Sequence, residues 1–316
     1  MAKKKLKTAL SLALTLALAL LAFFYIRDHW PEFQALWQKP ISSQLWLGVY
    51  GFWLLALILN SEILRLGVRV HKIPLGFWEA LALNMSTMAA NYFLPLKGGA
   101  GLRAYYLLSR LKMVLMDFIS QLMAISVHTL ATGSLLALLG LMSMPPSPAR
   151  APLALYFGLT FGLGLVSLLG FGRFKLLKHP RLAALVRGWD LFRANPKTLA
   201  WLTIMQLAYF TCVAQANRLC FSAFNIDLSW GQAYFYSAGQ LHSTIINLTP
   251  AGLGVVEAFA VLAGQILGFS PAEALMAQGL SRLAQLSILA SIGLLSWPFL
   301  SRRPVLSSPS KEPNPS

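Results

Sequence analysis

The residues of this chain best suited to chemistry are ionisable side chains that follow proline and glycine inside long apolar segments. The first such segment reads NYFLPLKGGAGLR, from Asn91 to Arg103, and the second reads NLTPAGLGVVE, from Asn247 to Glu257. An arginine binds a phosphate through two parallel hydrogen bonds, and the backbone amides at a helix N-terminus bind it as well. The two segments are therefore candidates for an anion-binding site.

The candidate substrate-binding residues are the polar, charged and helix-breaking members of these segments, with one arginine further along the chain. They are Asn91, Pro95, Lys97, Gly98, Gly99 and Arg103 in the first segment, Asn247, Pro250, Gly252, Gly254 and Glu257 in the second, and Arg282. A charge within a bilayer costs about 2.5–3.5 kcal/mol on insertion scales, so each one needs a compensating interaction. We expect Glu257 and Arg282 to form a buried pair, which is either a static salt bridge or part of an anion site. Lys97 and Arg103 are either phosphate ligands or ordinary basic residues at the membrane interface.

The elements that must position these residues are membrane-spanning helices. Hydrophobic residues make up 57% of the chain and charged residues only 11%, and several apolar runs reach the roughly 20 residues that a spanning helix needs. The clearest runs are Thr8–Ile26, Gln44–Leu64, Leu115–Met142, Leu153–Phe171, Leu199–Phe224 and Ala274–Leu300. The net charge of +16 comes from Lys and Arg between the runs, which favours cytoplasmic loops over nucleic-acid binding. We therefore expect an integral protein of the cytoplasmic membrane.

The distribution of basic residues predicts which segments cross. If every apolar segment crossed, the basic residues around Arg103 and those of 173–197 would lie outside, against the positive-inside rule. Both regions lie inside if Trp78–Leu111 enters and leaves from the cytoplasm as a re-entrant pair of half-helices, and Trp230–Phe269 does the same from outside. Both termini are then cytoplasmic, and the external basic residues are Arg27, Lys39 and Arg150.

The predicted fold is therefore an all-α polytopic membrane protein with six full transmembrane helices and two re-entrant half-helix pairs. Each half has three crossings, and because three is odd, the second half is inverted relative to the first. The repeats cover about 1–144 and 151–300 of one transmembrane domain, 1–300, and 301–316 are predicted to be a disordered cytoplasmic tail. Corresponding breaks in two halves of a transporter point to its binding site.

No motif suggests a metal, a cofactor or a catalytic group. The histidines lack metal-ligand spacing, no P-loop motif is present, and Cys212 and Cys220 lie in one apolar helix, as expected of packing residues. His242 beside Ser243 is an adjacent pair rather than a base with its nucleophile. We therefore predict that the protein is not an enzyme and uses no cofactor.

The two broken segments resemble the signature regions of the lysylphosphatidylglycerol synthase transmembrane family, also called flippase-like membrane proteins. The first family pattern, N-x-x-x-P followed by G-G-[DE]-x-x-R-x-x-x-L, is matched by Asn91, Pro95, Gly98, Gly99, Arg103 and Leu107. The later pattern, P-x-G-[LI]-G-x-x-E with an arginine in the final helix, is matched by Pro250, Gly252, Gly254, Glu257 and Arg282. The chain departs from the family at Ala100, where an acidic residue is expected, and this argues against zwitterionic or aminoacylated lipids as substrates.

The resemblance implies a lipid flippase or transporter. A polar groove between the inverted halves would take a phosphate-bearing head group while the acyl chains stay in the bilayer, so membrane lipids would be the partners. The soluble aminoacyl-transferring domain of bifunctional relatives is not found in the sequence, and we expect no lipid aminoacylation by this chain. Two alternatives stay open. One is an intramembrane enzyme or accessory factor in the biosynthesis of modified phospholipids, polyprenyl lipids or hopanoids, and the other is a scaffold for a lipid-biosynthesis enzyme.

Overall fold

The computed structural model describes residues 27–93, 98–170, 190–244 and 252–301, together with Leu20, Phe24 and Tyr25. Within these residues the protein is entirely helical, with eleven α-helices, one short π-helical turn and no strand. The predicted all-α class is thus confirmed for the described part of the chain. The predicted cytoplasmic tail and most of the first apolar run lie outside it.

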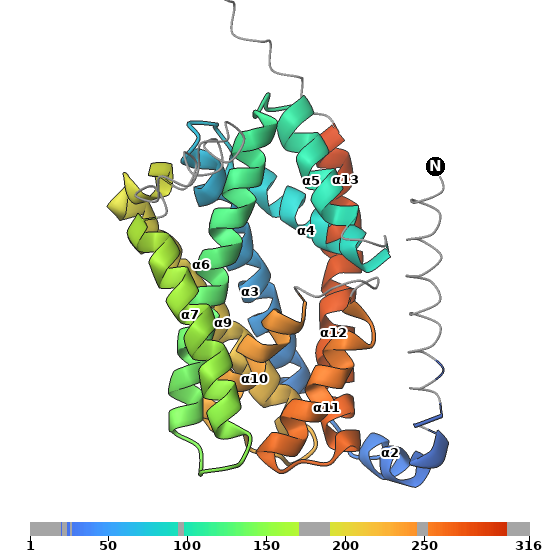
Figure 1. Ribbon diagram of the computed structural model, residues 1–316. Helices are drawn as coiled ribbons and strands as arrows, with labels where there is room; N and C mark the ends of the chain where they lie inside the picture. Colours follow the sequence, from blue (N-terminus) through green and yellow to red (C-terminus); the bar gives the residue numbers. More distant parts are fainter. Residues whose placement is uncertain are drawn as a thin grey trace, which may run out of the picture.

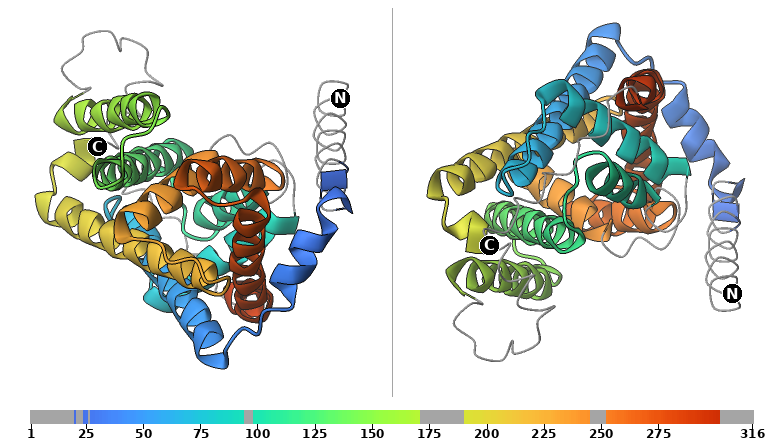
Figure 2. Two further views of the ribbon diagram at one scale, coloured as in Figure 1. Left: turned by 90° about the horizontal axis from the view of Figure 1, so that it is seen from below. Right: turned by 90° about the horizontal axis from the view of Figure 1, so that it is seen from above.

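Four helices are long and apolar enough to cross a membrane. They are α3 (Ser43–Arg69), α6 (Leu115–Met142), α7 (Arg150–Gly170) and α9 (Pro196–Ser222). The last predicted span corresponds to α12 (Pro271–Ile288), the π-helical turn η3 (Leu289–Gly293) and α13 (Leu294–Ser301), which follow one another without a gap. The short helix α2 (Trp30–Trp37) precedes α3 at the edge of the bundle (Figure 2).

Both broken segments form pairs of shorter helices. α4 (Phe77–Phe93) is followed by α5 (Gly98–Ser109), and α10 (Trp230–Ser243) is followed by α11 (Val255–Leu267). The two helices of each pair pack against one another. The pairs lie toward opposite ends of the bundle, α4–α5 in the upper half of Figure 1 and α10–α11 in the lower half.

Capping residues in the sequence set several helix starts. The side chains of Ser42, Ser229 and Ser270 each accept a backbone N–H bond in the first turn of α3, α10 and α12. Pro271 occupies the start of α12, where a backbone N–H has no partner within the helix. These helices therefore begin where local chemistry satisfies their free amides.

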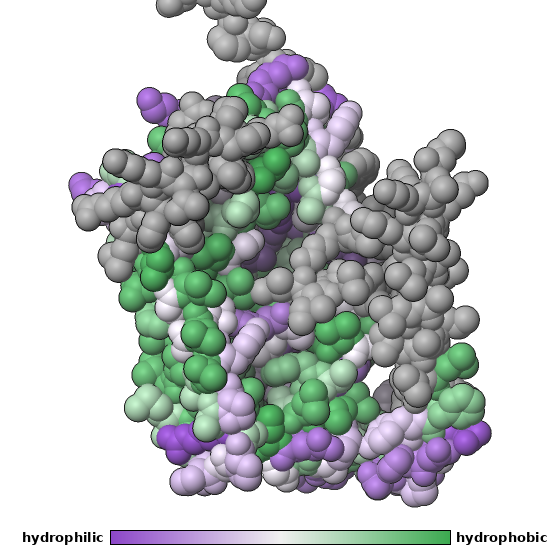
Figure 3. Space-filling model, viewed as in Figure 1, coloured by the Kyte–Doolittle hydropathy of each residue, from purple (hydrophilic) through white to green (hydrophobic). Residues whose placement is uncertain are grey.

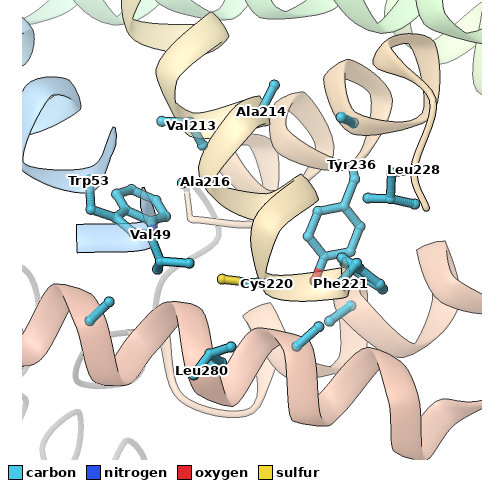
Figure 4. Packing of buried hydrophobic residues seen from close by; sticks show 14 of the residues in the cluster. Val49, Trp53, Val213, Ala214, Ala216, Cys220, Phe221, Leu228, Tyr236 and Leu280 are labelled. Atoms are coloured by element: carbon cyan, nitrogen blue, oxygen red, sulfur yellow. The ribbon is translucent and has the colours of Figure 1, made fainter. Parts of the chain in front are cut away.

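The core lies between α3 and α9, which come from different halves and pack together extensively. Ala214 and Ala216 on α9 are fully buried, and such small side chains let two helices approach closely. Figure 4 shows this cluster, with Val49 and Trp53 of α3 on one side of α9 and Tyr236 of α10 on the other. Both cysteines are buried free thiols in this region, consistent with the packing role predicted for them.

One helix of each pair packs against a long helix of the other half of the chain. α4 packs against η3 and α13 of the second half, while α10 packs against α6 of the first half. The first helix of each pair therefore contacts the last long helix of the other half. α7 lies on the outside of the bundle beside α6 (Figure 2).

One face of the bundle is largely apolar between its two ends. In Figure 3 hydrophobic residues cover much of the middle of the face, and hydrophilic residues gather toward its two ends. On α7, the side chains of Leu155, Leu159 and Leu163 are each more than half exposed. An apolar surface of this extent fits contact with lipid rather than with water.

Candidate functional site

A cavity of about 320 Å³ lies among helices of both halves. Its walls come from α3, α4, α5 and α9 to α12. The charged residues among its described lining are two arginines, Arg103 and Arg282, and no Asp or Glu is among them. The other polar lining residues carry amides or hydroxyls: Asn60, Asn84, Asn91, Tyr92, Tyr209, Ser237, Gln240, Thr244, Gln278 and Gln285. The cavity is thus polar and cationic within an apolar bundle.

Arg103 of α5 is held by a neutral partner, Asn84 of α4. Its Nη2 donates to Asn84 Oδ1 at 3.1 Å, and the Asn84 amide in turn donates to Ser61 Oγ of α3 at 3.0 Å. The Arg103 Nε is buried and has no hydrogen-bond partner among the described residues. No described carboxylate forms an ion pair with Arg103. This guanidinium therefore keeps most of its donors for another acceptor.

Arg282 of α12 is held by a carboxylate. Its Nε lies 2.5 Å from Glu257 Oε1, with the Arg282 side chain 12% and the Glu257 side chain 27% exposed, so the predicted pair is present. Glu257 Oε2 also accepts the backbone N–H of Gly254 at 2.7 Å. Gly252 and Gly254 have φ angles of +67° and +87°, a conformation that glycine adopts without strain. Glu257 thus compensates Arg282 and caps α11 at once.

Asn91 and Gly99 explain why α4 and α5 pack closely at the first break. The Gly99 N–H donates to Asn91 Oδ1 at 2.9 Å, so a side chain of α4 caps the N-terminus of α5, which begins at Gly98. A Cβ atom at Gly99 would lie 1.9 Å from the backbone oxygen of Thr87. Only glycine allows α4 and α5 to approach this closely, and this approach sets the position of Arg103.

The structure brings part of the predicted site together. Three of the predicted residues line the cavity: Asn91, Arg103 and Arg282. Five more shape or hold its surroundings: Gly98, Gly99, Gly252, Gly254 and Glu257. The remaining four, Pro95, Lys97, Asn247 and Pro250, lie outside the described residues, and their roles stay predictions.

The sequence interpretation missed an amide network in the second half. Gln240 Nε2 donates to Gln278 Oε1 at 3.0 Å, and Tyr236 donates to the same oxygen at 3.1 Å. Asn217 of α9 donates to Ser237 at 2.9 Å and to the Gln240 oxygen at 3.3 Å. Neutral amides in apolar helices usually bond neighbouring helices, and neither charge nor a helix break marks these as lining a cavity.

His242 has a structural role. Ser134 Oγ of α6 lies 3.2 Å from its Nε2, and the Tyr156 hydroxyl of α7 lies 2.8 Å from its Nδ1. Both ring nitrogens therefore have partners on neighbouring helices. The imidazole connects α6, α7 and α10 rather than facing the cavity.

Comparison with known protein families identifies a match over most of the chain. The family described as "Lysylphosphatidylglycerol synthase TM region" matches residues 9–293, a range that includes both breaks and both arginines. The chain belongs to this family. It is accordingly a multi-pass membrane protein of a family associated with lipid modification and flipping. No curated protein and no solved structure matches the chain.

Proposed function

We propose that this protein moves a phosphate-bearing lipid head group across the cytoplasmic membrane, through the cavity between two inverted halves. The observation that carries the proposal is that Arg103 and Arg282, which follow the two separate breaks, line one cavity. Glu257 compensates Arg282 alone, so the described residues give the cavity a charge of about one positive unit. A phosphodiester carries one negative charge, and arginine binds it through charge-assisted hydrogen bonds.

The proposal includes six full transmembrane helices, two re-entrant helix pairs and cytoplasmic termini. The bundle supports this arrangement because α4–α5 and α10–α11 lie toward opposite ends of it (Figure 1). The C-terminal end of α3 and the N-terminal ends of α6 and α9 lie toward the same end of the bundle as the α4–α5 pair (Figure 1). Arg69, Lys112 and Lys197 are at or close to these helix ends in the sequence. We therefore propose, from the positive-inside rule, that this end is cytoplasmic.

Cysteine labelling tests the topology. Cys212 and Cys220 are buried, so a membrane-impermeant maleimide would report mainly on an introduced cysteine. We expect Lys112→Cys and Lys197→Cys to react only after the membrane is opened, and Ser147→Cys, in the loop between α6 and α7, to react in intact cells. External labelling at both lysine positions would contradict the proposed topology.

In the proposed cycle, Arg103 meets the phosphate from the cytoplasmic side and Arg282 meets it deeper in the cavity. Lys97 would be a second cytoplasmic ligand. Glu257 holds the charge of Arg282 while the cavity is empty, which lowers the free energy of that state. Rocking of one half against the other would open the cavity to each side in turn while the acyl chains stay in the bilayer. We propose that transport is passive or driven by an ion gradient.

A liposome assay tests the function. The purified protein is reconstituted with fluorescent phosphatidylglycerol, and a membrane-impermeant reductant reports how much label reaches the outer leaflet. We expect the labelled lipid to move between the leaflets faster than in protein-free vesicles. With Arg103→Gln, we expect this increase to be lost. No exchange under any pH gradient or voltage would remove lipid transport as the function.

We propose transport rather than group transfer. The involvement of both His242 nitrogens in helix packing supports this choice, because a general base must reach the reacting group. Mass spectrometry of the lipids before and after incubation with the same vesicles tests it. A new lipid species that depends on the protein would favour an enzyme or accessory factor in lipid biosynthesis.

A further inference from the structure

The described cavity lining contains cations and neutral polar groups but no acid. Two arginines face it, and the carboxylate that compensates one of them, Glu257, is not among the lining residues. An ammonium group on a bound lipid would therefore find no carboxylate in this lining. Burying a charge without a partner is unfavourable, so a zwitterionic or cationic head group is poorly accommodated here.

Several donors of the lining have no partner among the described residues. The Arg103 Nε and the Trp53 Nε1 are both buried and form no hydrogen bond with a described residue. The whole Trp53 residue is only 5% exposed. Gln278 also lines the cavity, and its two bonds to described residues are both accepted by Oε1, so its Nε2 is not used as a donor to them. Buried donors are rarely left unpaired in proteins. The free donors thus indicate a ligand that is rich in acceptor oxygens.

Much of the remaining polar lining is built from amides. Gln240 and Gln278 belong to the network with Asn217 and Tyr236, which holds both glutamine side chains in place. On α3, the Asn60 amide makes only a long contact with Met88 sulfur at 3.9 Å, and its Oδ1 has no partner among the described residues. Free amide donors and acceptors together suit hydroxyl groups, which both donate and accept.

The size of the cavity suits a small head group. About 320 Å³ is near the lower end of the roughly 300–1,000 Å³ range of ligand pockets. A phosphate with one small polyol fits within this volume.

We infer that the cavity selects a lipid phosphodiester whose head group is a small neutral polyol, such as glycerol or a single ring, and disfavours amino head groups. The inference rests on the proposed function and specifies its substrate class. Arg103 binds the phosphate, and the amides of α3, α10 and α12 bind the hydroxyls.

Native mass spectrometry of the detergent-solubilised protein tests the selectivity. The probe is an equimolar mixture of phosphatidylglycerol, phosphatidylinositol, phosphatidic acid, phosphatidylethanolamine and lysylphosphatidylglycerol with identical acyl chains. We expect the two polyol lipids to be retained about tenfold more than the two amino lipids and several-fold more than phosphatidic acid. Glycerol phosphate is added separately, and we expect it to compete weakly because it lacks acyl chains.

Two variants at Gln278, with a control variant at Gln265, locate the selectivity. Gln278→Leu should lower retention of phosphatidylglycerol to the level of phosphatidic acid and leave phosphatidic acid unchanged, while Gln265→Leu, on the exposed side of α11, should change neither. Gln278→Glu keeps the acceptor that Tyr236 and Gln240 use, so it guards against a folding defect in the leucine variant. We expect it to raise the retention of the amino lipids relative to phosphatidylglycerol.

The outcomes separate the two proposals. Equal retention of polyol and amino lipids, or Gln278 variants with unchanged selectivity, would overturn the head-group inference and leave lipid transport standing. Retention of no lipid would overturn both proposals. Glycerol phosphate binding as tightly as the lipids would support the head-group chemistry but assign it to a soluble ligand, against lipid transport.

Discussion

Arg103 and Arg282 face the same cavity, yet one is held by an amide and the other by a carboxylate. The difference follows from the two helix pairs. At the second break, Glu257 stands in the first turn of α11 and reaches Arg282. At the first break, position 100 stands in the first turn of α5, one turn before Arg103, and is alanine. Residues three apart on a helix are neighbours, so an acid at position 100 would lie beside Arg103. The missing acid leaves Arg103 available to an anion, whereas Arg282 has a partner within the protein.

The largest expected effect on stability is at the compensated arginine. Glu257→Gln keeps an acceptor for the Gly254 N–H but leaves Arg282 without a charged partner. Breaking a buried pair in this way destabilises proteins by about 3–5 kcal/mol, and partial exposure of Glu257 places this pair at the lower end. Unfolding in detergent should show a loss of about 3 kcal/mol, most of which the double change Glu257→Gln with Arg282→Gln restores. If Arg103→Gln lowered the free energy of unfolding as much as Glu257→Gln does, the proposed difference between a compensated and an uncompensated arginine would be wrong.

The largest expected effect on binding is at the uncompensated arginine. Hydrogen bonds to charged groups contribute about 1.5–3 kcal/mol, so Arg103→Gln should weaken phosphatidylglycerol binding by about 10-fold to 100-fold. Arg103→Lys keeps the charge but loses the planar guanidinium with its two parallel donors. Its affinity for phosphatidylglycerol should lie between that of the unmodified protein and that of Arg103→Gln. Lipid titration in nanodiscs measures this effect. The double change at Glu257 and Arg282 should bind more tightly than Arg103→Gln, and the reverse order would assign the phosphate to Arg282.

The close approach of α4 and α5 is the next test of the first site. Gly99→Ala places a methyl group against the backbone of Thr87, and overpacking of this kind costs about 1–3 kcal/mol. Gly101→Ala is the matched control, because a Cβ atom there meets nothing within 4 Å. We expect Gly99→Ala to lower both the unfolding temperature and phosphatidylglycerol affinity, and Gly101→Ala to lower neither. A loss of affinity in both variants would mean that helix contact is not what positions Arg103.

The smallest expected effect comes from restoring the missing acid. Ala100→Asp should pair with Arg103 and interact favourably with the N-terminus of α5, which stabilises a helix by about 0.3–1 kcal/mol. Phosphatidylglycerol affinity should fall by several-fold because the carboxylate competes with the phosphate. Ala100→Asn, which has nearly the same shape without the charge, should leave the affinity unchanged. Tighter phosphatidylglycerol binding by Ala100→Asp would contradict the assignment of Arg103 as the anion ligand.

Much of the fold was predictable because bilayer-spanning helices depend on simple properties. Apolar runs predicted α3, α6, α7 and α9, and the Pro and Gly breaks predicted that two segments would split into shorter helices. The family pattern marks Asn91 as a site residue. Its cap on Gly99 was not foreseen, since the backbone of α5 had first to fold back against α4.

The amino-acid sequence by itself determined the apolar helices, the positions of the two breaks and the expectation that Glu257 pairs with Arg282. Length, hydrophobicity and the cost of an isolated charge in a bilayer are enough for these inferences. Only the tertiary structure decided that both breaks contribute to one cavity and that Arg103 is held by Asn84. It alone placed Gln240 and Gln278 in the lining. The sequence does not show whether a neutral amide side chain bonds a neighbouring helix or lines a cavity. This depends on what the side chain faces, which is decided when the two halves pack together.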